Sequence, residues 1–132
     1  MPTSLRLTIA GRQFVAMLDD GPTVERLLAQ LPLRGTVRRW GAEVALVIDL
    51  GCPLEPHARN RLVAGEVAYW PVGATLSFFC GATPLTATGS DQPVAASAVT
   101  PIGRVDDPTG LVRYAESGME LRLEIEGDSR VQ

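Results

Sequence analysis

The chain has 132 residues, of which 45% are hydrophobic and 20% charged, and this composition indicates one soluble globular domain with a single core. Its 12 cationic residues are all arginine and its one histidine is His57, which excludes a Schiff-base lysine, a P-loop lysine and a zinc site with two histidines. The net charge of -3 and the scattered arginines argue against a broad basic face, so we expect no nucleic-acid partner.

The first part of the chain predicts strands and one helix. Alternating apolar and polar residues predict a pair of strands over 5–9 and 14–18. A helix is predicted over 22–31, because it begins with proline and is followed by Pro32. Its apolar face is formed by Val24, Leu27, Leu28 and Leu31. Beyond it, 36–40 and 43–48 predict a hairpin.

Two long loops, over 49–64 and 81–93, carry many turn-forming residues. Between them, 66–70 and 75–80 predict strands joined by a turn. Loops of this length in a small domain are uncommon and are usually functional. We expect 81–89, which is rich in small residues, to form a flexible rim of a pocket.

The last part of the chain predicts a strand over 95–105, a helix over 108–114 and a strand over 119–126. Asp107 is placed to cap the helix. The predicted fold class is therefore all-β, with eight strands in a closed barrel and two short helices that cap it.

We expect one domain over 1–127 and a loose tail over 128–132. The first residues lack a basic segment followed by an apolar run, and no apolar run reaches the roughly 18 residues of a membrane span. We expect a cytoplasmic protein with no membrane partner, in which Cys52 and Cys80 are free thiols.

Aromatic residues gather in the predicted 66–70 and 75–80 hairpin. Neighbouring side chains of a strand face opposite sides, so one of Tyr69 and Trp70 lies inside and the other outside. The same holds for Phe78 and Phe79. The outer rings either pack against the helices or line a groove.

One segment, GEVAYWPVGATLSFFCGATP over 65–84, is more specific than the strand patterns. Further motifs are Arg39–Val44, Gln92–Pro93, Ala96–Val99 and Ile102–Val105. Together they resemble a family of small prokaryotic cyclophilin-like domains of unknown function, over nearly the whole chain. The resemblance implies an eight-stranded closed barrel with a helix at each end. One departure is an insertion before Ala96, where the family usually continues almost directly from Gln/Arg-Pro to Ala-Ser.

The resemblance to cyclophilins brings prolyl isomerase activity into consideration. That activity depends on an arginine in a Phe-His-Arg strand segment, a glutamine and an apolar pocket, and no Phe-His-Arg segment occurs here. Arg38 is the residue that could approach the same face. A divergent prolyl isomerase is therefore one alternative, and an oligomeric subunit with exposed aromatics as its interface is another.

The leading hypothesis is a binding module without established catalysis, whose groove lies beside the aromatic hairpin and takes a small molecule or an extended peptide. The residues expected to line it are Arg38, Trp40, Glu43, Tyr69, Phe79, Thr83 and Ser97. We predict no catalytic residue, no metal site and no cofactor. A nucleophilic Cys80 would need a positive field or a histidine, and a small buried apolar cysteine is the favoured interpretation.

Overall fold

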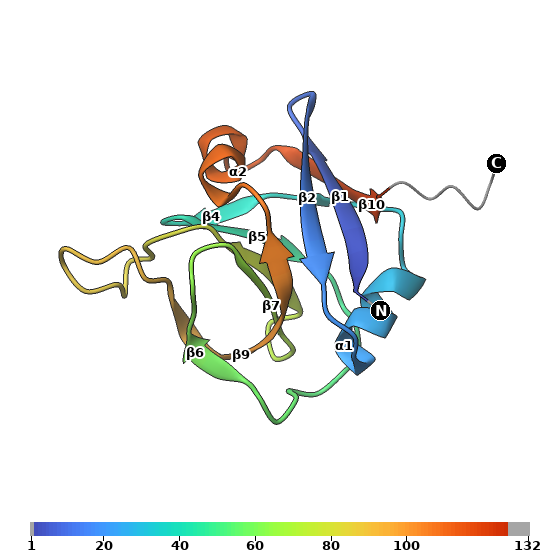
Figure 1. Ribbon diagram of the computed structural model, residues 1–132, viewed down its shortest axis with the longest axis horizontal. Coiled ribbons are helices and arrows are strands. Elements are labelled where there is room, and N and C mark those ends of the chain that lie inside the picture. Colours follow the sequence, from blue (N-terminus) through green and yellow to red (C-terminus); the bar gives the residue numbers. More distant parts are fainter. Residues whose placement is uncertain (1, 127–132) are drawn as a thin grey trace.

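The computed structural model describes residues 2–126, and the tail expected over 128–132 lies outside them. Within these residues ten strands and two helices form (Figure 1). In chain order they are β1 (Thr3–Ile9), β2 (Arg12–Leu18), α1 (Pro22–Ala29), β3 (Leu33–Thr36), β4 (Arg38–Trp40), β5 (Glu43–Val47), β6 (Arg59–Arg61), β7 (Glu66–Trp70), β8 (Thr75–Phe79), β9 (Val94–Val105), α2 (Pro108–Tyr114) and β10 (Glu120–Ile125).

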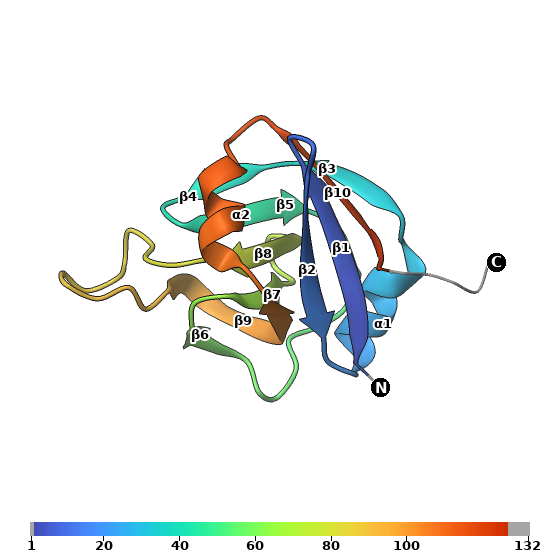
Figure 2. The same ribbon diagram turned by 45° about the horizontal axis from the view of Figure 1, so that its top comes forward.

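The strands pair in the order β3-β10-β1-β2-β9-β7-β8-β5-β4, and β6 pairs with β9 off this path. Figure 2 shows β5, β8 and β7 stacked in this order. The mainly β class is confirmed, but the closed eight-stranded barrel is not. Among the described residues there are ten strands, and no ladder joins the end strands β3 and β4.

The expected strand over 36–40 is divided at the buried residue Val37. Its N–H donates to the carbonyl of Met119 at 2.8 Å, and its carbonyl accepts from Gly118 at 2.9 Å, so this residue extends the pairing of β3 toward β10. The next residues form β4 and pair with β5. The two ends of the sheet path are therefore connected by the chain itself rather than by strand pairing.

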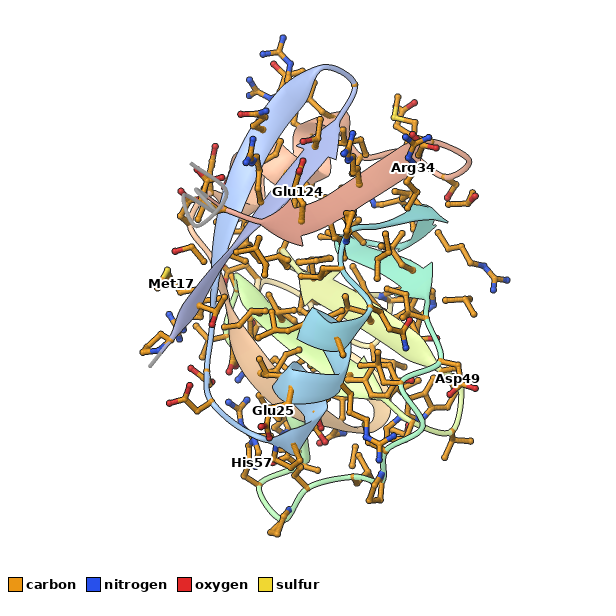
Figure 3. The ribbon with its side chains drawn as sticks, turned by 90° about the vertical axis from the view of Figure 1, so that its right-hand side faces the viewer. Met17, Glu25, Arg34, Asp49, His57 and Glu124 are labelled. Atoms are coloured by element: carbon orange, nitrogen blue, oxygen red, sulfur yellow. The ribbon has the colours of Figure 1, made fainter. Side chains whose placement is uncertain are left out.

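The helices cover the ends of this curved sheet. α1 begins at Pro22 and buries Val24 and Leu27. Figure 3 shows it lying over one end of the molecule, with strand side chains gathered behind it. α2 begins after Asp107, whose carboxylate accepts from the N–H of Gly110 at 3.0 Å, as the capping prediction required. No helix formed by residues 2–126 combines the length and apolar character needed to cross a bilayer.

The strand β6 lies inside the segment expected to be a loop. Its sequence, Arg-Asn-Arg, is exposed and has no apolar alternation, so contacts with distant segments stabilise it: it pairs with β9, and Arg59 forms an ion pair with Glu66 of β7. Arg59 lies opposite Val99 and Arg61 opposite Val94, so residues 95–98 of β9 bulge out of this ladder. The bulge lies directly at the insertion seen in the sequence. The β8–β9 loop projects from the body in Figures 1 and 2.

Candidate functional site

The β7–β8 hairpin decides which aromatic side chains face outward. Trp70 pairs with Thr75 and Glu66 pairs with Phe79 across the turn at 71–74. Directly opposed residues of an antiparallel pair share a face, so Trp70 and Phe79 lie together on the outer face of the sheet. Phe78 belongs to the main core, and the prediction that each aromatic pair divides between the two faces is confirmed.

Tyr69 was expected in the groove, but the structure places it in the main core at 1% exposure. Its hydroxyl accepts from the N–H of Leu50 at 2.9 Å and donates to the carbonyl of Ile48 at 2.7 Å. Trp70 takes its place on the outer face. The length of the turn could have predicted this exchange. Four residues at 71–74 set a register in which Tyr69 and Phe79 lie on opposite faces of the sheet.

A cavity of about 200 Å³ lies on the outer face, between the β5–β8–β7 strands and the first half of β9. It is lined by Trp40, Glu43, Trp70, Thr75, Ser77, Phe79, Ala95, Ala96, Ser97 and Val99. Four expected residues are among them: Trp40, Glu43, Phe79 and Ser97. Sequence reasoning missed Trp70, Thr75 and Ser77, which follow from the same hairpin register as Phe79.

A small second hydrophobic core packs β6 and β9 against the outer face of the sheet. It consists of Leu62, Ala68, Phe79, Ala95 and Val99, with Trp70 packed against it. Burial of these apolar side chains holds the β9 wall of the cavity in place. Phe79 thus contributes to both the second core and the cavity lining.

One carboxylate lies in the cavity wall. The hydroxyl of Ser77 donates to Oε2 of Glu43 at 2.5 Å. Burial raises the pKa of Glu43, and the hydrogen bond from Ser77 opposes that rise only in part. Of the described residues that line the cavity, Glu43 is the single titratable one, so the wall supplies it with no counter-ion.

The turn after β7 explains why a glycine follows the Tyr-Trp-Pro motif. A Cβ atom on Gly73 would overlap the indole of Trp70, so the ring lies directly against this backbone. The side-chain-free position therefore lets Trp70 fold over the turn and form one wall of the cavity.

The other two expected residues, Arg38 and Thr83, lie outside the cavity lining. Arg38 is exposed on β4, opposite Ala45, and is not among the lining residues. Thr83 is buried, and its hydroxyl donates to the carbonyl of Val94 at 2.6 Å, which ties the β8–β9 loop to the start of β9. It positions the wall rather than lining it.

Arg39 does not extend freely into solvent, because its Nη1 donates to the carbonyls of Val112 at 3.1 Å and Ala115 at 2.7 Å. These contacts satisfy carbonyls at the end of α2. The residue therefore anchors the helix on β4, which leaves Arg38 as the exposed member of the pair.

Cys80 is a free, buried thiol, and burial raises its pKa to about 12. A thiol with this pKa is protonated at neutral pH, which agrees with the small buried residue favoured from sequence. Within residues 2–126, no group of three or more His, Cys, Asp or Glu side chains is placed to hold a metal ion.

Comparison with known proteins identifies relatives of this fold. The solution structure of the hypothetical protein AF2241 from Archaeoglobus fulgidus superposes with a TM-score of 0.75 and 27% sequence identity, covering 94% of this chain and 95% of that one. A comparison with curated proteins gave no significant match. The family model described as Cyclophilin-like matches residues 3–124, which confirms the resemblance seen in the motifs. The chain belongs to the Cyclophilin-like family.

Proposed function

We propose that the protein is a binding module whose outer-face cavity receives one group of a small molecule or of an extended peptide. The observation that carries this proposal is the cavity itself, whose lining includes two tryptophans, Phe79 and the hydrogen-bonded Glu43–Ser77 pair. Apolar walls with a few polar groups are the usual composition of ligand sites. The rings would supply contact area and the pair would orient a polar atom.

The size of the cavity limits its occupant. Its volume of about 200 Å³ exceeds that of an engineered protein cavity of roughly 150 Å³ that binds benzene. Sites for drug-sized ligands are larger, on the order of 300–1,000 Å³. The cavity therefore suits one aromatic or aliphatic group of side-chain size.

The observations favour binding over the two alternatives. A prolyl isomerase would need a guanidinium beside the apolar cavity, and Arg38 is outside its lining. An oligomeric interface of exposed aromatics would need rings on the surface, yet every aromatic residue of 2–126 is buried or half-buried. Binding without catalysis is therefore the function that we propose.

Titration with benzyl alcohol, followed by two-dimensional NMR, tests this proposal. We expect saturable shifts of the indole N–H resonances of Trp40 and Trp70. Ala96→Phe should abolish them by filling the cavity, whereas Ala87→Phe, in the exposed β8–β9 loop, should leave them unchanged. Shifts that survive Ala96→Phe would overturn the proposal, and so would a failure of benzyl alcohol and of its charged analogues benzylamine and benzoate to give saturable shifts.

A second measurement separates binding from isomerisation. We expect that the protein does not accelerate cis/trans relaxation of a Xaa-Pro peptide. If it does, and Arg38→Ala abolishes the acceleration, the isomerase alternative replaces the binding module.

A further inference from the structure

The carboxylate of Glu43 lies in the cavity wall without a cationic partner. Its Oε2 accepts from Ser77, and no residue of 2–126 donates a hydrogen bond to its Oε1. The other lining residues are neutral. On the same face, the nearest arginine by strand register is Arg38, and it forms no ion pair with Glu43.

An ionised carboxylate that is partly removed from water is unfavourable unless a counter-charge or hydrogen-bond donors compensate it. Ser77 supplies one donor, and its own position is buried. Glu43 is half-buried, so the remaining compensation comes from water or from a ligand that displaces this water. A ligand cation beside the Oε1 atom would supply it.

The aromatic walls favour the same kind of occupant. Trp40, Trp70 and Phe79 line the cavity together with Glu43. The faces of such rings attract cations, tryptophan most strongly. The stem that carries the cation would also contact these rings and the apolar β9 wall. A charged head on an apolar stem therefore matches both parts of the lining.

We propose that the cavity binds a protonated amine or guanidinium on an apolar stem of side-chain size, with Glu43 as its counter-ion. This inference rests on the proposed function and names the ligand class of the same site. Small-molecule amines and the basic residues of an extended peptide share this chemistry. The experiment below separates these two sources.

Benzylamine, benzyl alcohol and benzoate place a positive, neutral or negative group on the same ring. The titration is carried out at about pH 8, where benzylamine is protonated and which lies well above the ordinary carboxyl pKa of 4.5. We expect benzylamine to bind roughly tenfold more tightly than benzyl alcohol, and benzoate more weakly than either.

A variant of Glu43 tests whether the preference comes from its charge. Glu43→Gln should remove the preference for benzylamine and keep the affinity for benzyl alcohol within about twofold. Glu25→Gln removes the same charge from the exposed side of α1 and should change neither affinity. Absence of a preference in the wild-type protein overturns the inference by itself, so this part of the test does not depend on the folding of a variant.

The outcomes distinguish the two proposals. If benzyl alcohol binds in the cavity as tightly as benzylamine, the binding module stands and the cation inference is overturned. If none of the three compounds binds saturably, both are overturned. A preference that survives Glu43→Gln also overturns the role of Glu43 as counter-ion.

A peptide series identifies the source of the cation. Acetyl-Gly-Arg-Gly-amide is compared with the same peptide carrying neutral citrulline. Tighter binding of the arginine peptide than of both citrulline peptide and benzylamine supports a basic residue of a peptide. Tighter binding of benzylamine supports a small-molecule amine, and equal binding of the two peptides overturns recognition of a peptide cation.

Discussion

Glu43 and Glu66 occupy equivalent places on either side of Phe79, yet their environments differ. Both pair with Phe79 across neighbouring strands, so all three side chains share the outer face. Both strands also begin with the same tripeptide, Glu-Val-Ala. The local sequence therefore provides no reason for the two carboxylates to behave differently.

The difference comes from β6. Arg59 on this strand donates from Nη1 to Oε1 of Glu66 at 2.9 Å and from Nη2 to Oε2 at 2.6 Å, and the N–H of Val63 donates to Oε1 at 2.7 Å. Burial alone would raise the pKa of Glu66, but these hydrogen bonds and the nearby arginines Arg59 and Arg104 lower it. No strand formed by residues 2–126 brings an arginine to Glu43 in this way, and burial raises the pKa of Glu43. One carboxylate is bound within the fold by Arg59 and Val63, and the other is the one that we propose receives a ligand.

The largest expected effect is on stability when Glu66 is changed. Glu66→Gln should lower the free energy of unfolding by about 2 kcal/mol, because it removes the charge that holds Arg59 and the turn before β7. Urea denaturation measures this loss, with Glu25→Gln as the control for an exposed carboxylate. A loss no greater than that of the control would contradict a structural role for Glu66.

The same substitution at Glu43 should not lower the free energy of unfolding. Glu43→Gln keeps an acceptor for Ser77 and removes a partly buried charge, so stability near pH 8 should be unchanged or higher by up to about 1 kcal/mol. Denaturation under the same conditions tests this prediction. If Glu43→Gln destabilised the protein as much as Glu66→Gln, the two carboxylates would share a structural role.

The pH dependence of stability should also separate the two residues. A raised pKa in the folded state means that the contribution of Glu43 is present below its ordinary value of 4.5 and is lost as pH rises through the raised value. The lowered pKa of Glu66 has the reverse effect: its contribution is present above 4.5 and is lost as pH falls through the lowered value.

Relative to Glu43→Gln, the wild-type protein should therefore lose stability as pH rises above 4.5, and relative to Glu66→Gln it should lose stability as pH falls below 4.5. Thermal unfolding of the three proteins across this range provides the comparison. Parallel curves for the two variants would show that their environments do not differ as described.

The smallest effect on stability is expected where neither carboxylate is changed. Gly73→Ala should displace the indole of Trp70 and weaken benzyl alcohol binding roughly fivefold, while unfolding changes by no more than about 0.5 kcal/mol. NMR titration measures the affinity. Val72→Ala, in the same turn and 84% exposed, is the matched control. Unchanged affinity in Gly73→Ala would remove Trp70 from the binding site.

Much of the fold could be predicted because its signals are local. Prolines at 22 and 108 begin the two helices, and apolar alternation identifies β1, β2 and β10. The division at Val37 and the strand β6 could not be predicted in this way. Both depend on which segment, distant in the sequence, offers free backbone groups for pairing.

The candidate site likewise has one part that the local sequence predicts and another that depends on distant contacts. Strand alternation separated Trp70 from Tyr69 and Phe79 from Phe78, and the turn length determines which rings share a face. The β9 wall depends on the bulge beside β6 and on the packing of the second core. These contacts join residues far apart in the sequence, so local patterns do not reveal that they enclose a cavity.

By itself, the sequence determined the mainly β class, both helices and the membership of a family, because periodicity, capping and motifs are properties of neighbouring residues. Only the tertiary structure decided the different roles of its two Glu-Val-Ala strands. Arg59 reaches Glu66 because β6 pairs with β9, whereas Glu43 faces the cavity. The charge state and the availability of a carboxylate depend on what folds against it, and identical tripeptides do not encode that.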